Sequence, residues 1–422
     1  MSFSSCDTQH RITKQSLSDG YEFLFNGTDL SGWVNVNNAP DTWLINDNSI
    51  FCTGKVQSNL RTVSFYENYI LEFEYLPLEK NGDAAVLIHA DGLPSTGQPF
   101  PKGIRCSISN NSTFTTLEAI NGASLNKNEL ANIKHQMIKI NQWNKYRIES
   151  SRSEISVLLN GNLIGKGTTQ NLRSGYISFA STKTAIYFRN IKIKELETAN
   201  PPAEQRSVSG DGFRSLYNSF DLSEWKMLPG HLNHWTILDG MINYDGKSAE
   251  KDKSLWSKKQ FRDFILIADV RLTRKPEMAM SSVILPNGEN AINEDGSNKE
   301  VEIPYAGDTG IYLRGNSKSQ VNIGNRFIGS GEIYGYRADK KLPPEVRASA
   351  TPKIKADKPP GEWNRFVITM KGERVTVMLN NQLVIDNALL PGIPARGAIA
   401  LQDDHANNNT FQFANLFIKE FN

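Results

Sequence analysis

Cysteine is too scarce in this sequence for a disulfide framework. There are three cysteines among 422 residues, at positions 6, 52 and 106. None forms a Cys-x-x-Cys pair, the spacing typical of zinc and redox sites. We therefore expect Cys52 and Cys106 to be buried as small apolar side chains.

Long apolar runs and an excess of one charge are also missing. No segment approaches the roughly 18 apolar residues that span a membrane as a helix, so no transmembrane segment is predicted. The chain has 47 basic and 45 acidic residues, and its basic residues are scattered. Without a basic patch there is no electrostatic footprint for nucleic acid, which we exclude as a partner.

The N-terminal residues, Met1-Ser-Phe-Ser-Ser-Cys6, have no apolar core of a signal peptide. Small residues before a cysteine nevertheless resemble the end of a bacterial lipoprotein signal. This pattern favours an extracytoplasmic protein, periplasmic or at the outer surface, anchored to lipid through Cys6. The alternative is a disordered tail over residues 1–19 in which Cys6 has no role.

An internal repeat is the strongest signal present. Four blocks of the first half reappear in the same order in the second half, and each pair ends on similar residues. The pairs are Leu24-Phe-Asn-Gly-Thr-Asp-Leu-Ser-Gly-Trp33 with Leu216-Tyr-Asn-Ser-Phe-Asp-Leu-Ser-Glu-Trp225, Gln142–Ile148 with Glu362–Ile368, Leu159–Leu163 with Leu379–Leu383, and Phe188–Glu195 with Phe413–Glu420. We infer two diverged copies of one domain.

The boundaries of the copies follow from composition. Residues 198–210 are polar and contain the pair Pro201-Pro202, which is typical of a short exposed linker. This predicts domain 1 over residues 20–197 and domain 2 over residues 211–422. Domain 2 is the better candidate for chemistry, and domain 1 is expected to be accessory or to bind sugar.

Both copies are predicted to be all-β. Apolar residues recur at every second position in short runs such as Tyr69–Tyr75 and Arg374–Leu379, which is strand periodicity. Asn160-Gly161, between two such runs, indicates a hairpin turn, and Asn380-Asn381 occupies the same place in the second copy. The fold class expected is two tandem jelly-roll β-sandwiches. The tryptophans that recur in both copies are expected to be core and edge anchors.

Two long insertions interrupt the second copy, over residues 276–305 and 338–360. Loops of this length are usually functional or mobile. The first contains Glu289, Glu294, Asp295, Glu300 and Glu302, whose oxygens are of the type that binds Ca²⁺. Their spacing matches no EF-hand loop, so a solvated acidic loop is the alternative to a calcium site.

Several ordered motifs together resemble the 3-keto-disaccharide hydrolase family, once per copy. They are the Phe-Asn-Gly-x-Asp-Leu-Ser-Gly-Trp opening, Gly307–Arg314, Gly329–Arg337, Pro360–Asn364, Leu401-Gln402 with His405, and the closing Ile-Lys-Glu. The resemblance implies a concanavalin A-like sandwich that cleaves glycosides whose sugar carries a ketone at C3. Such a ketone acidifies the C2 hydrogen, so a base removes it and the C1 substituent leaves by elimination. The reaction needs no cofactor, but it does need a base, a donor for the enolate and an acid.

The expected catalytic residues are Arg314, Glu332 and His405. Arg314 follows a strand that should end at the rim, where its guanidinium would hold the ketone or enolate oxygen. Glu332, Tyr334 and Tyr336 would share one face of a strand. His405 titrates near neutral pH and is the expected base, although a solvated turn histidine is the alternative. The remaining substrate-binding candidates are Arg337, Gln320, Asn322, Gln402 and His89, the last standing where the second copy has Arg314.

Two functions remain open from the sequence. One is an enzyme that cleaves 3-keto-glycosides by elimination or hydrolysis. The other is a non-catalytic carbohydrate-binding protein in which Tyr334, Tyr336 and Gln402 grip a sugar by stacking and hydrogen bonds. Both make a carbohydrate the partner, and neither predicts an oligomeric state.

Overall fold

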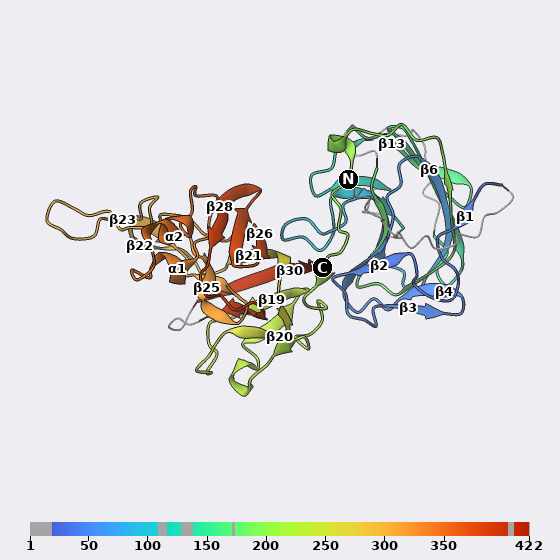
Figure 1. The fold of residues 1–422 in the computed structure, drawn as a ribbon. Helices are drawn as coiled ribbons and strands as arrows, with labels where there is room; N and C mark the ends of the chain where they lie inside the picture. The colour runs from blue at the N-terminus through green and yellow to red at the C-terminus, as the bar shows by residue number, and fades with distance from the viewer. Residues whose placement is uncertain (1–18, 109–115, 128–137, 171–173, 404–408, 422) are drawn as a thin grey trace, which may run out of the picture. The chain divides into compact units, whose positions relative to one another are not determined.

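The computed structural model describes residues 19–108, 116–127, 138–170, 174–403 and 409–421. The chain divides into two compact units. Domain 1 contains residues up to 95 and 100–211, and domain 2 contains residues 96–99 and 212–422. Each domain can be followed by its colour in Figure 1.

Domain 1 consists of two antiparallel sheets. The larger sheet has the order β10-β13-β12-β11-β6-β15-β4-β3, with β1 also paired to β15, and the smaller has the order β2-β5-β14-β7-β8-β9. The strands are β1 (Glu22–Phe23), β2 (Trp33–Val36), β3 (Trp43–Asn46), β4 (Ser49–Cys52), β5 (Gln57–Thr62), β6 (Tyr69–Pro77), β7 (Asp83–Ala90), β8 (Gly103–Ser107), β9 (Leu117–Ile120), β10 (Asn126–Lys127), β11 (Asn144–Ser151), β12 (Glu154–Leu159), β13 (Asn162–Thr168), β14 (Tyr176–Thr182) and β15 (Ile186–Glu195). A 3₁₀ turn, η1 (Ala203–Gln205), follows them.

Domain 2 repeats this plan. Its larger sheet has the order β18-β19-β30-β21-β26-β27-β28 with β16 paired to β30, its smaller sheet is β17-β20-β29-β24-β25, and β22 pairs with β23. The elements are β16 (Arg214–Ser215), β17 (Trp225–Lys226), η2 (Pro229–His231), β18 (Trp235–Leu238), β19 (Met241–Tyr244), β20 (Leu255–Phe261), β21 (Phe264–Leu272), β22 (Glu277–Ser282), β23 (Glu300–Tyr305), β24 (Thr309–Leu313), β25 (Asn316–Ile323), α1 (Tyr334–Arg337), α2 (Pro344–Ser349), β26 (Asn364–Lys371), β27 (Arg374–Leu379), β28 (Gln382–Leu389), β29 (Gly397–Gln402) and β30 (Phe411–Glu420).

The two copies have the same strand order, which confirms the tandem duplication and the all-β sandwich fold. The order β3-β4-β15-β6-β11-β12-β13 in domain 1 corresponds to β18-β19-β30-β21-β26-β27-β28 in domain 2. The order β2-β5-β14-β7-β8 likewise corresponds to β17-β20-β29-β24-β25. Each pair of sheets encloses one apolar core, with residues of both sheets in contact.

Alternation of apolar and polar residues explains these sheets. β6 alternates strictly between buried and half-buried positions, because successive side chains point to opposite faces of a strand. The predicted hairpin is also present: Asn160 and Gly161 have φ of 49° and 86°, the left-handed values that a type I′ turn requires. Asn380 and Asn381 take left-handed φ at the same turn of domain 2.

The repeated tryptophans and the cysteines lie where the sequence predicts. Trp33, Trp43, Trp225 and Trp235 are buried in the two cores. Trp143 and Trp363 are half-buried, each beneath an arginine guanidinium, as expected of edge anchors. Cys52 and Cys106 are free and buried, and burial raises the pKa of both thiols.

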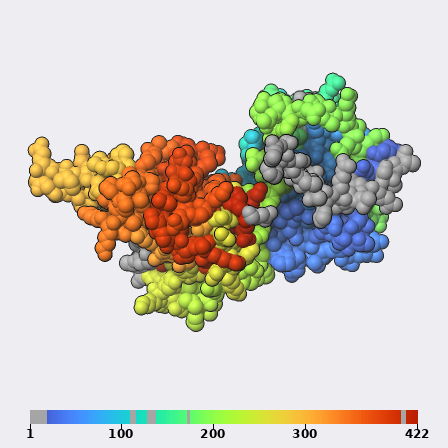
Figure 2. All heavy atoms as spheres, viewed as in Figure 1, coloured from blue at the N-terminus to red at the C-terminus, as the bar shows by residue number. Residues whose placement is uncertain are grey.

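The two insertions of the second copy are partly ordered rather than open loops. Residues 276–305 contain the hairpin β22–β23, which extends from the body of domain 2 in Figures 1 and 2. Residues 338–360 contain helix α2. No helix among the described residues is long and apolar enough to cross a membrane.

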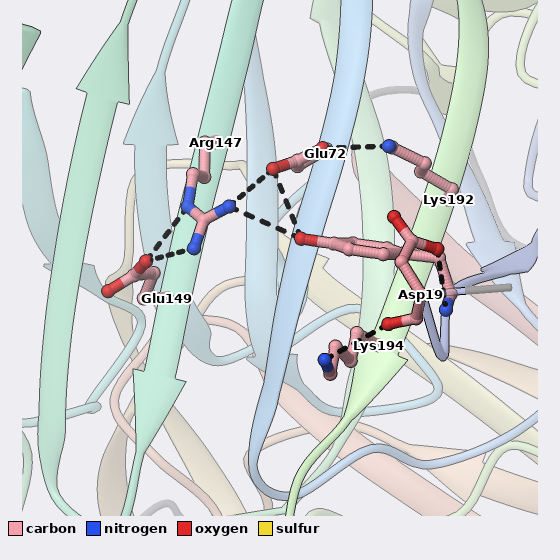
Figure 3. A network of polar contacts seen from close by, with 7 residues as sticks. Asp19, Glu72, Arg147, Glu149, Lys192 and Lys194 are labelled. Atoms are coloured by element: carbon pink, nitrogen blue, oxygen red, sulfur yellow. Dashed lines mark hydrogen bonds and ion pairs between the residues drawn. The ribbon is translucent and has the colours of Figure 1, made fainter. Parts of the chain in front are cut away.

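The outer face of the larger sheet of domain 1 carries a network of charges, drawn in Figure 3. The Tyr21 hydroxyl donates to Glu72 at 3.1 Å, and Arg147 donates to both groups. Burial and Glu72 raise the pKa of Tyr21. Because Tyr21 immediately precedes β1, this network fixes the first strand of the domain to the sheet.

Candidate functional site

A row of polar side chains crosses the smaller sheet of domain 2. In the register of this sheet, Gly310 of β24 lies between Gln402 of β29 and Asn322 of β25. Residues 331–333 extend the sheet beyond β25. The backbone N–H of Asn322 donates to the backbone carbonyl of Glu332 at 2.8 Å, and Val321 pairs with Ile333. Ile333 and Val321 lie in the core, so Glu332 and Asn322 point to the opposite face. We call Gln402, Gly310, Asn322 and Glu332 the polar row.

Asn322 is incompletely satisfied in this row. Its side chain is 3% exposed, and its Oδ1 atom is buried without a hydrogen-bond partner among the described residues. An unpaired buried amide oxygen costs about 1–3 kcal/mol, so such a group in a folded protein needs an explanation. A ligand hydroxyl that donates to Oδ1 would supply one.

Gly310 makes room for an amide that crosses the row. The Gln320 side chain lies over it and donates from Nε2 to Gln402 Oε1 at 2.9 Å. A Cβ at Gly310 would lie 2.5 Å from Gln320 Nε2. The glycine is therefore required by this close approach, which brings Gln320, Gln402 and Asn322 into one group of amides.

Two buried carboxylates pair with arginines at the edge of the row. Glu332, 3% exposed along its side chain, accepts a hydrogen bond from Arg337. Asp308, immediately before β24, pairs with Arg326. Burial together with the neighbouring charges of Arg326 and Arg347 lowers the pKa of Arg337 to about 10. This edge therefore offers a carboxylate that can act as a base beside a positive charge that can stabilise an enolate.

Aromatic side chains flank the amides and the charges. Trp256 and Tyr312 lie on the same face, with ring centroids 5.7 Å apart. Tyr334 lies at the other edge and is 42% exposed, while the amides of the row are buried. Phe327, which follows Arg326 in the chain, is also exposed.

Arg314 does not lie at an open rim, so the prediction of an exposed strand-end guanidinium is wrong. It is 2% exposed, and its guanidinium donates to the carbonyls of Arg262 and Gly372 and to Asp263. Burial lowers the pKa of Arg314, although Asp263 counteracts this effect. All three groups belong to the turns that connect strands, so Arg314 fixes these turns to the end of β24.

His89 occupies the same structural position in domain 1. It is buried, and its Nε2 lies 2.8 Å from the Ser150 hydroxyl of the opposite sheet. His89 and Arg314 have φ of 51° and 52°, and a glycine of the neighbouring strand packs against each backbone. The matched geometry indicates that these two residues hold a bend in the fold, and it removes the accessible surface that a substrate-binding His89 would need.

Residues 334–337 form helix α1, not the predicted strand, so Glu332, Tyr334 and Tyr336 do not share a face. Tyr336 is 1% exposed, belongs to the core, and donates to the Pro391 carbonyl at 3.3 Å. The Tyr336 side chain therefore packs in the apolar core and does not face the polar row. The glycines at 329, 331 and 335 let the chain turn here, which interrupts the alternation that the sequence suggested.

The remaining predictions are His405 as the base and a calcium site in the first insertion. His405 lies outside the described residues. Among the described residues, no three His, Cys, Asp or Glu side chains gather as a metal site would require. Of the acidic residues proposed for calcium, Glu289 instead pairs with Arg347, and Asp295 accepts hydrogen bonds from Ser297.

Domain 1 has no amides at the three positions that correspond to Gln402, Gly310 and Asn322. Strand register places Ala180, Ala85 and Ser107 where domain 2 has Gln402, Gly310 and Asn322. Ala85 and Ala180 form a small apolar cluster with Leu87 and Ala90. The polar row is thus a property of domain 2.

A cleft of about 310 Å³ in domain 2 is open to solvent at a different place. Its lining includes Arg271, Asn325, Ser330 and Asp357. It lies beside the loop that carries Arg326, but none of the predicted site residues lines it. Both oxygens of Asp357 accept hydrogen bonds from Ser330, so the cleft offers fewer unpaired groups than the polar row.

Sequence reasoning missed several residues of this site. Gly310, Asp308 and Arg326 were not singled out, because only strand register shows that they adjoin the amides. Trp256 could have been found from the sequence. The other six tryptophans recur in both copies, but domain 1 has Arg61 at the position of Trp256. A folding role shared by the two copies therefore does not explain Trp256.

Comparisons with known proteins agree with the duplicated sandwich. The sequence model of the 3-keto-alpha-glucoside-1,2-lyase-like domain matches residues 20–194 and again residues 212–419. No curated protein has a significant sequence match to this chain.

Solved structures resemble single copies of the domain. A candidate glycosyl hydrolase from Parabacteroides distasonis is 19% identical, with a TM-score of 0.34, and the match covers 42% of this chain and 95% of that one. The carbohydrate-binding module CBM66 from Bacillus subtilis is 13% identical, with a TM-score of 0.29, over 38% of this chain and 94% of that one. At these identities the similarity concerns the fold alone.

Proposed function

This chain belongs to the 3-keto-alpha-glucoside-1,2-lyase-like domain family, and from that premise we propose that domain 2 cleaves 3-keto-glycosides at the polar row. The observation that carries the proposal is the alignment of Gln402, Asn322 and the buried carboxylate Glu332 on one face, with a glycine between the amides. Domain 1 has kept the fold and lost these groups, so the row is not a requirement of folding.

Each step of the reaction has a group suited to it. Glu332 takes the proton from C2, because a carboxylate within reach of an acidic C–H is a competent general base. As the C2–H bond breaks, its electrons form a C2–C3 double bond, and the ketone becomes an enolate with negative charge on the C3 oxygen. The enolate then re-forms the ketone, its electrons form the C1–C2 double bond, and the C1–O bond breaks. The leaving oxygen takes a proton, and water then adds across the double bond.

Charge that develops on the C3 oxygen in this step is stabilised by fixed donors. Arg337 and the amides Gln320, Gln402 and Asn322 lie in and around the row, and Arg337 and Gln320 are already held by hydrogen bonds to Glu332 and Gln402. Donors that need no reorganisation stabilise a transition state most effectively.

The test is cleavage of a 3-keto-disaccharide and of its unoxidised parent by the full chain. We expect release of the leaving sugar from the keto form only, because the parent has no acidic C2 hydrogen. Glu332→Gln, which keeps the shape of the side chain, should lower the rate about 10²- to 10⁴-fold, the contribution of a general base. Glu345→Gln, an exposed carboxylate in α2, is the matched control and should leave the rate unchanged. Equal cleavage of both sugars, or full activity in Glu332→Gln, would refute the proposal.

A further inference from the structure

Arg337 has hydrogen-bonding capacity that the folded chain does not use. Its Nε donates to Glu332, and its Nη1 lies 3.3 Å from the Gly288 carbonyl. Its Nη2 has no hydrogen-bond partner among the described residues. The buried side-chain atoms without a partner do not include this Nη2, so it is accessible to solvent. The guanidinium is otherwise enclosed, with its side chain 12% exposed.

Three arginines gather around this free edge, each paired with one carboxylate: Arg337 with Glu332, Arg326 with Asp308 and Arg347 with Glu289. Arg347 donates from Nε to the Arg337 carbonyl at 3.0 Å and is itself 7% exposed. Burial and the positive charges of Arg326 and Arg347 disfavour the charged form of Arg337 and so lower its pKa. An anion at Nη2 would relieve this repulsion and form charge-assisted hydrogen bonds.

An exposed aromatic ring lies beside the same edge. The Cζ of Arg337 is 5.7 Å from the centroid of the Tyr334 ring, and Tyr334 also interacts electrostatically with Arg326. Tyr334 is 42% exposed, which is unusual for a large aromatic side chain beside buried charges. The face of an exposed aromatic ring next to the unused Nη2 group of a guanidinium suits a sugar ring that bears a carboxylate.

We propose that Arg337, Arg326 and Tyr334 form a subsite for an acidic sugar. The carboxylate of a uronate accepts hydrogen bonds from Nη2 of Arg337, and its ring packs against Tyr334. The substrate class of the site is then a glycoside that contains a uronate, rather than a neutral disaccharide. The cleavage of such a glycoside rests on the proposed function, whereas its binding does not.

The test compares the binding of methyl glucuronide and methyl glucoside to the full chain by calorimetry. We expect the glucuronide to bind about 10- to 100-fold more tightly, as charge-assisted hydrogen bonds require, and less tightly as salt is raised. Tyr334→Ala changes only an exposed side chain and should reduce this preference. Arg337→Lys keeps the charge beside Glu332 but lacks the planar fork, so it should abolish most of the preference. Arg396→Gln, an exposed arginine outside the site, is the control and should retain it.

The outcomes separate this inference from the cleavage reaction. Equal affinity for the two glycosides would overturn the subsite, even if neutral 3-keto-glycosides are cleaved. Binding of inorganic sulfate as tight as that of the glucuronide would also overturn it, since the sugar ring would then contribute nothing. A preference for the glucuronide that disappears in Tyr334→Ala and Arg337→Lys would support the subsite, even if no 3-keto-glycoside is cleaved.

Discussion

Replacement of Gly310 by alanine tests the arrangement of the polar row. Its backbone φ is not in the left-handed region, so alanine is tolerated by the chain itself and gains about 0.4–1 kcal/mol from the unfolded state. The new Cβ would lie 2.5 Å from Gln320 Nε2 and 2.7 Å from Cγ, so the Gln320 side chain must move. This movement breaks its hydrogen bond to Gln402.

The cost follows from burial. Gln320 and Gln402 are 7% and 0% exposed, and a buried amide that loses its partner costs about 1–3 kcal/mol. We therefore expect Gly310→Ala to destabilise domain 2 by about 1–2 kcal/mol, the difference between this cost and the backbone gain. Urea unfolding followed by hydrogen exchange in β24 and β25 measures this change.

Domain 1 provides the matched control. Ala85 occupies the position of Gly310 and has no glutamine above it, so Ala85→Gly should cost only about 0.5–1 kcal/mol. If Gly310→Ala is as stable as the wild type within about 0.5 kcal/mol, the crossing of Gln320 over this glycine is refuted.

Two further predictions concern buried groups of domain 2. Arg314→Met should destabilise the domain by about 3–5 kcal/mol in urea unfolding, because it removes the guanidinium that donates to Asp263 and to three backbone carbonyls. A change below about 1 kcal/mol would contradict the structural role. Burial and Glu373 raise the pKa of Tyr336 to about 12, so the folded state holds its proton more tightly than the unfolded state. The raised pKa contributes to the free energy of unfolding. This contribution is fully present below pH of about 10 and is lost as the pH rises through 12, by about 1.4 kcal/mol per pH unit. Tyr336→Phe should therefore weaken the alkaline loss of stability measured by denaturation at pH 8 to 12, and an unchanged pH profile would contradict the assignment.

Repetition made the fold predictable from the sequence. The matched blocks mark strands that both copies need, and apolar alternation identifies the face that is buried. Cys52, Cys106 and the recurring tryptophans were placed correctly for the same reason: each lies in a segment with a clear period.

The site was less predictable because it depends on long-range register. Gln320, Asn322 and Gln402 were named as candidates one by one, but that they adjoin each other follows only from the register of three strands. Arg314 was misplaced because a left-handed φ at the strand end turns its side chain inward, which the sequence does not reveal. Tyr336 was misplaced because glycines convert an alternating pattern into a turn of helix.

The fate of the C2 hydrogen tests the central claim most directly. A 3-keto-glycoside labelled with deuterium at C2 is incubated with the full chain and with Glu332→Gln, and its NMR spectrum is followed beside a sample without protein. We expect the released keto sugar to have lost the label, with loss and release both slowed in Glu332→Gln. Release of a keto sugar that retains its deuterium would contradict proton abstraction at C2.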